Sequence, residues 1–327
     1  MNKELISVVV PAYNCAPWLG PCLDSLLAQT YENLEIVVVD DGSKDDTWQL
    51  LADYAAKDSR IHPVHQENGG VTAARLRGVR ESRGEWIGFA DGDDVLEPQM
   101  YERLLHNALT HDAEISHCGF QVLYPGGGTE YLHGTGTFQV QDRKTALRDL
   151  LEEKIVEPSL CSKLFRRELF AGLEEKMDAT IKNNEDMLMN YYLFAQAEKA
   201  VFEDVCPYHY LIHPGSASRR KLNQHLIYDP IRVRQIIMDQ CAPEIRDDAR
   251  RALARMCLVS YRQLVMEPGD EYREDMKRVR GLIRQQLPYA GLLPTRNGLL
   301  VRLISHVPWV FDGLYRIVAH VTGREKE

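Results

Sequence analysis

The first hundred residues of this 327-residue chain alternate between two hydrophobic patterns, and this alternation constrains the fold more than any other feature. Continuous β-rich apolar runs predict buried strands, and the stretches between them carry apolar residues at helical spacing. The predicted strands are residues 5–12, 34–39, 60–65 and 85–90, and the predicted helices are residues 17–29, 46–54 and 71–82, with Asp46 as a helix cap. Strands joined through helices pair in parallel, so we expect an α/β fold with a mostly parallel sheet and helices on both faces.

The remainder of the chain predicts a change of architecture. The middle is less regular, with predicted strands at 114–123 and 131–140 and predicted helices at 142–153 and 184–197. Beyond about Arg220 strand signals fade and helical patterns dominate. We therefore expect one domain over residues 1–220 and a helical region over 221–327 that contacts an acceptor, a membrane or a second copy of the chain.

The last helical segment, residues 299–321, carries an apolar stripe. Its members are Leu300, Leu303, Ile304, Val307, Phe311, Leu314 and Val318. Pro308 predicts a kink or a break in this helix. A helix whose stripe faces a protein core is favoured because it is commoner, although Trp309 and Tyr315 leave an interfacial membrane helix as the alternative.

Composition narrows the class of protein. A hydrophobic content of 44% is ordinary for a globular protein, and the net charge of −9 argues against nucleic acid as a main partner. No run reaches the ~18 apolar residues of a membrane span. The seven cysteines are scattered and never spaced Cys-x-x-Cys, which indicates reduced thiols in a cytoplasmic protein. Glu4 and Pro11 interrupt and end the N-terminal apolar run, which favours a strand over a signal peptide.

The segment from Trp86 to Asp94 ends an apolar strand in three carboxylates within four residues, Asp91, Asp93 and Asp94. Carboxylates this close repel one another unless a cation or protons intervene, and Mg²⁺ or Mn²⁺ prefers such oxygen ligands. An Asx turn that caps the helix beginning near Pro98 is the structural alternative. A calcium-binding EF-hand loop is excluded, because Leu96 stands where that loop needs glycine.

Polar side chains also follow the first two predicted strands. In a parallel sheet, ligands bind beyond the carboxyl ends of the strands, so these clusters should converge with the acidic turn. No Gly-x-Gly-x-x-Gly follows the first strand, which disfavours an ordinary dinucleotide fold. Tyr13 is suited to stacking on a planar base, and Asn14 to capping a helix or forming a plain turn. Asp41 and Gly42 suffice for the second turn, which leaves Asp40 free to accept a hydrogen bond from a ring N–H.

Four motifs in order carry a specific resemblance that covers roughly residues 5–218. They are Ser-Val-Val-Val-Pro-Ala-Tyr-Asn at residues 7–14, Glu-Ile-Val-Val-Val-Asp-Asp-Gly-Ser at 35–43, Asn-Gly-Gly-Val-Thr-Ala-Ala-Arg at 68–75 and Asp-Gly-Asp-Asp at 91–94. This signature resembles the family 2 glycosyltransferases of bacterial cell-surface polysaccharide synthesis. The resemblance implies a GT-A fold, a nucleotide-sugar donor with a UDP-sugar favoured, and inversion at the anomeric carbon.

The resemblance also implies roles for individual residues. Ala12, Tyr13 and Asp40 would hold the nucleoside, Arg75 would approach the diphosphate, and Gly92 belongs to the donor-binding motif. Asp91 and Asp93 would bind Mn²⁺ or Mg²⁺, with Asp93 nearest the ion. An ion on the diphosphate neutralises the leaving group, so such an enzyme needs ligands and no covalent nucleophile.

An inverting transfer needs a base on the other side of the sugar. Glu185-Asp186 matches the Glu-Asp pair of the family, and Asp186 would be that base, although a helix start has its own use for carboxylates. His213 lies in a segment that resembles the family's closing loop and would reach a phosphate; simple solvation is the alternative. Leu76 and Cys161 replace asparagines that are frequent in the family.

We therefore expect a metal-dependent glycosyltransferase that acts on a glycan or a lipid-linked acceptor, in the cytoplasm or at the inner face of the plasma membrane. A homodimer and a peripheral membrane contact are both compatible with the C-terminal helices. One alternative is a catalytically inactive nucleotide-sugar sensor or scaffold. The other is a sugar nucleotidylyltransferase, which would show a glycine-rich basic loop after the first strand, where this chain has none.

Overall fold

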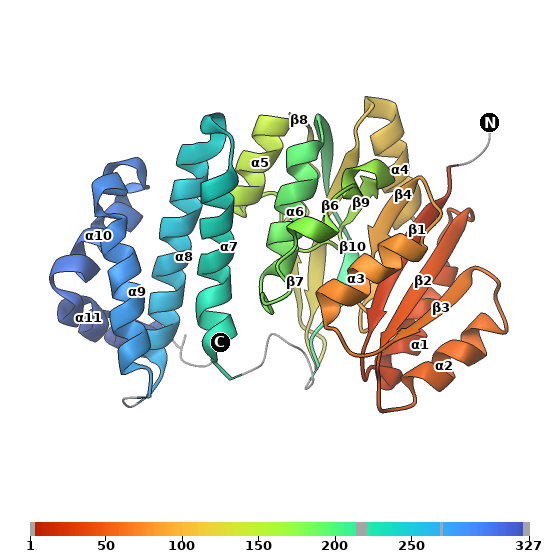
Figure 1. Cartoon of the computed structure of the whole chain (residues 1–327), viewed down its shortest axis with the longest axis horizontal. Coiled ribbons are helices and arrows are strands. Elements are labelled where there is room, and N and C mark those ends of the chain that lie inside the picture. The colour runs from red at the N-terminus through yellow and green to blue at the C-terminus, as the bar shows by residue number, and fades with distance from the viewer. Residues whose placement is uncertain (1–3, 214–220, 269–270, 323–327) are drawn as a thin grey trace. The chain divides into compact units, whose positions relative to one another are not determined.

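The computed structural model describes residues 4–213, 221–268 and 271–322 and divides the chain into two compact units, residues 1–220 and 221–327 (Figure 1). The strands of the first unit are β1 (Ile6–Ala12), β2 (Leu34–Asp41), β3 (Ile61–Gln66), β4 (Trp86–Phe89), β5 (Val95–Leu96), β6 (Ile115–Leu123), β7 (Thr129–Leu132), β8 (Phe138–Asp142), β9 (Lys163–Arg166) and β10 (Lys199–Leu211). Its helices are α1 (Ala16–Leu27), α2 (Thr47–Ala55), α3 (Val71–Glu81), α4 (Met100–His111), α5 (Arg143–Glu152) and α6 (Glu185–Gln196), with 3₁₀ turns η1 (Arg167–Phe170) and η2 (Glu174–Lys176).

One ten-stranded sheet organises this unit. Its order is β3-β2-β1-β4-β9-β6-β10-β5, with β7 beside β6 and β8 beside β10. The first four strands are parallel, as predicted. The sheet then becomes mixed, because β9 runs antiparallel to both β4 and β6, and β10 runs antiparallel to β5 and β8. The prediction of a mostly parallel sheet is therefore confirmed for β1 to β4, whereas the complete sheet is mixed.

Helices cover both faces of the parallel half, and two glycines allow them to approach closely. A Cβ at Gly78 of α3 would lie 2.3 Å from Val9 of β1, and one at Gly88 of β4 would lie 2.6 Å from Tyr101 of α4. Gly88 pairs with Val8, and successive residues of a strand point to opposite faces. Helices α3 and α4 therefore pack on opposite sides of the sheet.

Strands β5, β9 and β10 were not predicted, and one predicted strand forms two separate strands. β5 and β9 have two and four residues, too few for a periodic pattern to register, and the thirteen-residue β10 contains Glu203 and Asp204 in its middle. The run at 131–140 breaks into β7 and β8. At the start of α2, Asp46 occupies the N-cap position without a side-chain hydrogen bond; the Asp45 carboxylate accepts the Thr47 N–H instead, at 3.1 Å.

The second unit is helical. It comprises α7 (Gln224–Gln240), α8 (Arg246–Met266), α9 (Arg273–Gln285), α10 (Thr295–His306) and α11 (Pro308–Thr322), with 3₁₀ turns η4 (Pro243–Ile245) and η5 (Leu287–Leu292). These helices share one apolar core, in which Tyr261, Ile304 and Phe311 are buried. Among the described residues, no helix is long and apolar enough to cross a membrane.

The predicted C-terminal stripe is partly correct. Pro308 does split the helix, into α10 and α11. Ile304 and Phe311 face the core, whereas Leu314 and Val318 are 56% and 52% exposed, so their assignment to the core was wrong. Phe311, Leu314 and Val318 share a side of α11 by their spacing, so periodicity alone did not show that the core of the helical unit covers Phe311 and leaves the other two exposed.

A buried carboxylate fastens the parallel strands at their amino ends. Glu35 of β2 is 3% exposed and accepts hydrogen bonds from the Ser7 hydroxyl, from the Arg83 backbone N–H and from Arg83 Nε at 2.8 Å. Burial opposes its ionisation, but the bonds from Ser7 and Arg83 outweigh that effect and lower the pKa of Glu35. Glu35 therefore ties β1, β2 and the loop before β4 together as an anion.

We predict that Glu35→Gln lowers the free energy of unfolding by about 2 kcal/mol at neutral pH, because charge-assisted hydrogen bonds to a buried group are lost. The pKa of Glu35 is lower in the folded than in the unfolded state, so its contribution is present above the unfolded-state pKa and disappears as pH falls through the folded-state value. Urea unfolding of wild type and variant should therefore converge in acid. The control is Glu32→Gln, at an exposed position three residues earlier. An equal loss of unfolding free energy in both variants would contradict the proposed role of Glu35.

Candidate active site

The loops that follow β1 and β2 are fastened to each other at the carboxyl edge of the sheet. Asn14 accepts the Lys44 backbone N–H at 2.8 Å through its side chain, and its own N–H donates to the Ser43 hydroxyl at 3.0 Å. Asn14 has a left-handed backbone, with φ of 49°, and it does not cap α1, whose N-cap is Cys15. Of the two predicted roles of Asn14, a helix cap or a plain turn, the helix cap is wrong, and Asn14 joins two loops. The neighbouring Tyr13 is 48% exposed.

Asp40 and Asp41 at the end of β2 are both engaged within the protein. Asp41 accepts the backbone N–H groups of Gly69 and Gly70, each at 2.8 Å, and so fixes the start of α3. Asp40 accepts the Ser43 N–H at 3.2 Å and contacts His65 Nδ1 at 2.7 Å. The parallel register places His65 of β3 directly beside Asp40, so Asp40 already has partners in the protein, and its hydrogen bond to the ring N–H of a ligand stays a prediction. A carboxylate has lone pairs beyond these two contacts.

Residue His65 was missed in the sequence, although the rule that polar groups gather at strand ends would have found it. It lies near the carboxyl end of β3, just as Asp40 lies near the carboxyl end of β2, and its imidazole is 55% exposed. Trp48 of α2 lies edge-on to it, with ring centroids 5.3 Å apart, and is itself 40% exposed. Ala12 is buried at the end of β1. This edge thus offers aromatic and hydrogen-bonding groups side by side.

The acidic turn after β4 uses its three carboxylates differently. Asp94 is 1% exposed and accepts hydrogen bonds from the Tyr208 hydroxyl at 2.5 Å and the Leu211 N–H at 2.9 Å. The Tyr208 hydroxyl also accepts the Asp91 backbone N–H at 3.1 Å. Burial, and then the charges of Asp91 and Asp93, raise the pKa of Asp94. Asp94 therefore anchors the turn to β10 and does not form a cap for α4.

Asp93 faces the end of β10. His213 Nε2 lies 2.9 Å from Asp93 Oδ2, and the His213 ring stacks on Trp18 of α1 with centroids 3.9 Å apart. Burial and the nearby Asp91 raise the pKa of Asp93, while His213 opposes the shift. His213 is thus held in a defined position beside the acidic turn, and the alternative that it is simply solvated is wrong.

Gly92 separates these carboxylates for a steric reason. A Cβ at this position would lie 3.2 Å from Cys15 Sγ and 3.4 Å from the Pro11 carbonyl oxygen. A larger residue would push the turn away from the end of β1. Burial and the charge of Asp93 raise the pKa of Cys15 to about 12, so the group next to Gly92 is a neutral thiol.

Arg75 of α3 joins the acidic turn to the start of α6. Its Nη2 lies 3.0 Å from Asp91 Oδ1, and its Nη1 lies 3.4 Å from Glu185 Oε1, while the Arg75 side chain is 5% exposed. The resemblance places Arg75 near a diphosphate; in the structure both arms of the guanidinium are occupied by carboxylates. Contact with a diphosphate stays a prediction.

Asp186 lies in the first turn of α6, next to that bridge. Asn184 precedes the helix with a left-handed backbone, φ 69°, an uncommon conformation for a non-glycine residue that sets the direction in which the first turn enters. Burial raises the pKa of Asp186, Arg75 lowers it and Asp91 raises it again, with a net upward shift. For Glu185, burial and then Asp186 raise the pKa, and Arg75 opposes them. Two adjacent carboxylates thus resist ionising together.

The loop before β9 is fixed from two sides close to Asp186. Lys163, which is 1% exposed, donates through Nζ to the carbonyl oxygens of Glu157, at 2.7 Å, and Ser159. Asn190 of α6 donates to the Pro158 carbonyl at 2.6 Å and to that of Asp186 at 3.0 Å. Burial lowers the pKa of Lys163 to about 8. Hydrogen bonds therefore fasten the loop before β9 to itself and to the start of α6.

A divalent cation fits part of this arrangement. Oxygen and imidazole ligands suit Mn²⁺, and the 2.9 Å between Asp93 Oδ2 and His213 Nε2 is close to the ~3 Å that separates adjacent ligands bound at ~2.1 Å. Burial, and then repulsion between neighbouring carboxylates, raise the pKa of Asp93 and Asp94, and a cation here would relieve that repulsion. The described part of the chain contains no group of three or more His, Cys, Asp or Glu side chains that could hold a metal, so further ligands would come from elsewhere.

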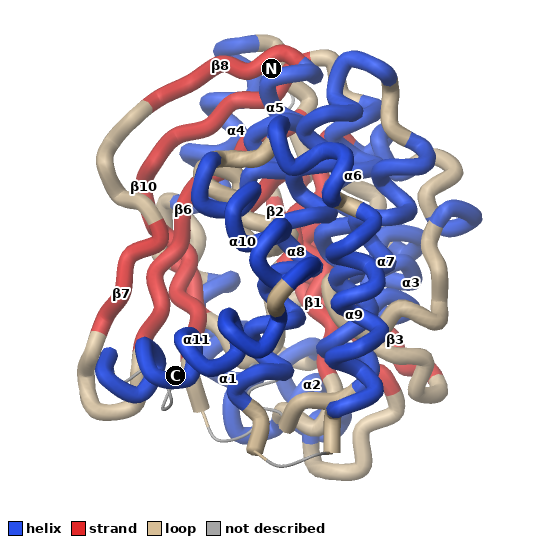
Figure 2. The backbone as a smooth tube through the Cα atoms, turned by 90° about the vertical axis from the view of Figure 1, so that its left-hand side faces the viewer, coloured by secondary structure: helices blue, strands red, loops and turns tan. Residues whose placement is uncertain are grey.

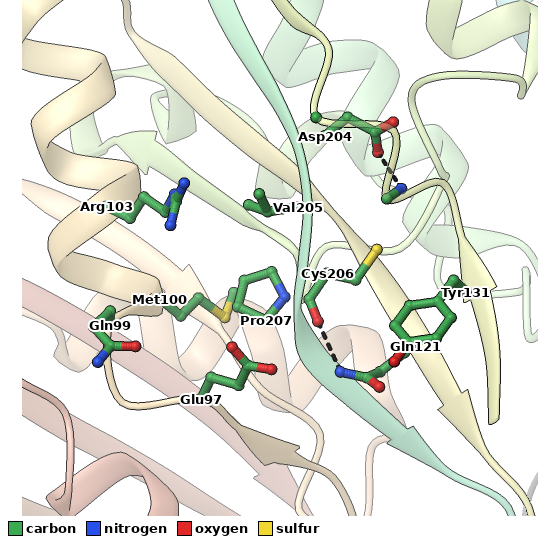
Figure 3. Close-up of a pocket in the computed structure, with 12 residues that line it drawn as sticks. Glu97, Gln99, Met100, Arg103, Gln121, Tyr131, Asp204, Val205, Cys206 and Pro207 are labelled. Atoms are coloured by element: carbon green, nitrogen blue, oxygen red, sulfur yellow. Dashed lines mark hydrogen bonds between the residues drawn. The ribbon is translucent and has the colours of Figure 1, made fainter.

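A separate cavity of about 340 Å³ lies away from these residues, between α4, β6, β7 and β10 (Figure 3). It forms where β10 shifts register between Glu203 and Tyr208. Gln121 donates to the Cys206 carbonyl at 3.0 Å, and the Asp204 carboxylate accepts the Gly134 N–H at 2.7 Å, as the dashed lines show. None of the predicted site residues lines this cavity.

Comparison with known proteins identifies the family. The family model described as "Glycosyl transferase family 2" matches residues 7–173. Glycosyltransferase GlyG of Streptococcus pneumoniae is 30% identical over 241 residues, which cover 71% of this chain and 78% of GlyG. The uncharacterized glycosyltransferase EpsJ of Bacillus subtilis is 32% identical over 244 residues, and the match covers 68% of this chain and 66% of EpsJ. The chain belongs to glycosyl transferase family 2.

The fold agrees with that assignment. The crystal structure of S. aureus TarS residues 1–349 in complex with UDP-GlcNAc superimposes with a TM-score of 0.76 at 19% identity, over 98% of this chain and 92% of that one. The GT-A fold expected from the motifs is confirmed by this likeness together with the family match.

We predict that Tyr208→Phe destabilises the protein by about 1–3 kcal/mol, because Asp94 loses its hydroxyl donor in a buried place. The acidic turn should also lose its anchor to β10. Thermal unfolding measures the first effect. Tyr131→Phe, 61% exposed on β7, should leave the midpoint unchanged, and an unchanged midpoint in Tyr208→Phe would contradict the anchoring role.

Proposed function

We propose that this protein is a metal-dependent, inverting glycosyltransferase that transfers a sugar from a UDP-sugar to a glycan or lipid-linked acceptor in cell-surface polysaccharide synthesis. The observation that carries the proposal is the Arg75 bridge, which brings Asp91 and the start of α6 to a single guanidinium. The carboxylates that would hold a cation and the one that would act as base thus lie on segments joined by one side chain. The complex of TarS with UDP-GlcNAc supports the choice of donor class.

The donor side of the reaction uses the strand-end residues. Tyr13, which is 48% exposed, would stack on the base, and Asp40 with His65 would accept or donate hydrogen bonds at its edge. Asp93 and His213, with Asp91 beside them, would hold Mn²⁺ or Mg²⁺. When bound, such a cation supplies positive charge that stabilises a departing diphosphate.

The acceptor side uses Asp186. Its carboxylate would take the proton of the acceptor hydroxyl as that oxygen forms its bond to the anomeric carbon and the bond to the diphosphate oxygen breaks. The upward shift in the pKa of Asp186 makes it a better base than an exposed aspartate. Inversion follows because the hydroxyl attacks from the side opposite the leaving group. Glu185 and Lys163 would act by positioning Asp186.

We predict that Asp186→Asn lowers the release of UDP from UDP-GlcNAc with Mn²⁺ by about 10²- to 10⁴-fold, the usual contribution of a general base. Calorimetry should show that UDP still binds this variant. Asp53→Asn, at an exposed position on α2, is the matched control and should release UDP at the rate of wild type.

Three results would contradict the proposal. UDP release by Asp186→Asn at the rate of wild type would remove its role as base. Tight binding of UDP-sugars by wild type with no turnover under any metal, across UDP-GlcNAc, UDP-glucose and UDP-galactose, would instead indicate a sensor or scaffold. Formation of a nucleotide-sugar from a nucleoside triphosphate and a sugar phosphate would indicate a nucleotidylyltransferase.

We predict that Mn²⁺ with UDP raises the thermal midpoint of wild type, since a ligand that binds only the folded state stabilises it. EDTA should abolish the shift. Asp93→Asn and His213→Ala should each reduce it strongly, whereas His106→Ala, an exposed histidine of α4, should not. An equal shift in His213→Ala and wild type would exclude His213 as a ligand.

A further inference from the structure

Helix α11 carries buried apolar residues on one face and exposed apolar residues beside that face. On one face, Phe311 is buried in the core of the helical unit with Tyr315 packed against it, and Ala319 is 3% exposed. The face is fastened to α8 by the Tyr261 hydroxyl, which donates to Asp312 at 2.9 Å, and by Arg316 Nε, which donates to the Val265 carbonyl at 2.9 Å. Packing therefore accounts for one side of α11 only.

Beside that face lies a row of exposed large aliphatic residues, which we call the outer stripe. Its members are Leu314, Ile317, Val318 and Val321, which are 56%, 62%, 52% and 77% exposed. Their spacing of i, i+3, i+4 and i+7 places them on one face of a helix. Trp309, one turn before the stripe, is 74% exposed. Figure 2 has α10 and α11 turned toward the viewer.

The charge of this segment differs in sign from that of the chain. Residues 295–322 contain three arginines, Arg296, Arg302 and Arg316, and one acidic residue, Asp312, whereas the whole chain has a net charge of −9. Arg296 and Arg302 are exposed on α10. Asp312 lies on the core side, where it is hydrogen-bonded to Tyr261. The exposed surface of α10 and α11 therefore presents aliphatic and basic side chains without a carboxylate.

We propose that α11 lies in the interfacial plane of an anionic lipid bilayer, with the outer stripe among the acyl chains and Arg296 and Arg302 of α10 near the headgroups. Fifteen helical residues extend about 22 Å, less than the ~30 Å of a bilayer core, so α11 lies on the membrane and does not span it. Tryptophan is enriched at the membrane–water interface, which suits Trp309. Apolar contact and attraction to anionic lipid add in such helices.

A second copy of the chain is a weaker occupant for this surface. A stable interface takes about 20–30 residues from each partner, whereas the outer stripe is a single row of four side chains and Trp309 adds one more exposed residue. Two copies would also bring arginines of like charge together around the row. The proposal does not rest on the enzymatic activity.

Flotation of the purified full-length protein with lipid vesicles tests the proposal. We expect it to float with vesicles made of equal parts phosphatidylglycerol and phosphatidylcholine, and much less with phosphatidylcholine alone. High salt should weaken the association, since the attraction to anionic lipid is screened. Ile317→Gln should reduce the apparent affinity about tenfold or more, since one large aliphatic side chain no longer enters the apolar layer.

The matched control is Leu109→Gln, an exposed leucine on α4 in the other unit that should leave flotation unchanged. Both variants should keep the thermal midpoint of wild type, because neither side chain is buried. Wild type that fails to float with anionic vesicles overturns the proposal, as does equal flotation of Ile317→Gln and wild type. A dimer in lipid-free solution that Ile317→Gln dissociates would also overturn it, in favour of a second copy.

Discussion

The ion pairs of Arg75 hold together the two halves of the candidate site. A guanidinium that is 5% exposed must be paired, because an isolated buried charge is very costly, and its partners are carboxylates 16 and 110 residues away in the sequence. The same positive charge reduces the repulsion among Asp91, Glu185 and Asp186. The acidic turn after β4 and the start of α6 therefore depend on each other, and removing Arg75 would leave their carboxylates uncompensated.

The acidic turn divides its work among three carboxylates according to burial. Asp94, the most buried, is bound by Tyr208 and Leu211 and makes the turn part of β10, whereas Asp93 contacts His213 and keeps 30% of its side chain exposed. Tyr208 and Lys163 lie in β10 and β9, two strands that the local sequence pattern did not predict. Their buried polar groups stiffen the loops around Asp93 and Asp186, so that the groups proposed to act in catalysis are carried on a preorganised frame.

In the helical unit, α11 has both buried and exposed apolar residues. The core of this unit buries Phe311 of α11, and Tyr261 and Val265 form hydrogen bonds with Asp312 and Arg316 of the same helix. The outer stripe lies outside that core. A single helix thus combines a structural face with an exposed apolar surface.

Local patterns were enough to predict β1 to β4, the helices α1 to α3 and the convergence of Tyr13, Asp40 and Asp91 at one sheet edge, because periodicity and strand order are properties of short segments. They also located the start of α6 at Glu185 and Asp186. What they could not predict were the pairing of β9 and β10 into the sheet, His65 beside Asp40, the partners of Arg75, and the exposure of Leu314 and Val318. Each of these depends on which distant segment packs alongside. That choice is made by register, burial and charge pairing in three dimensions, and only the tertiary structure decides it.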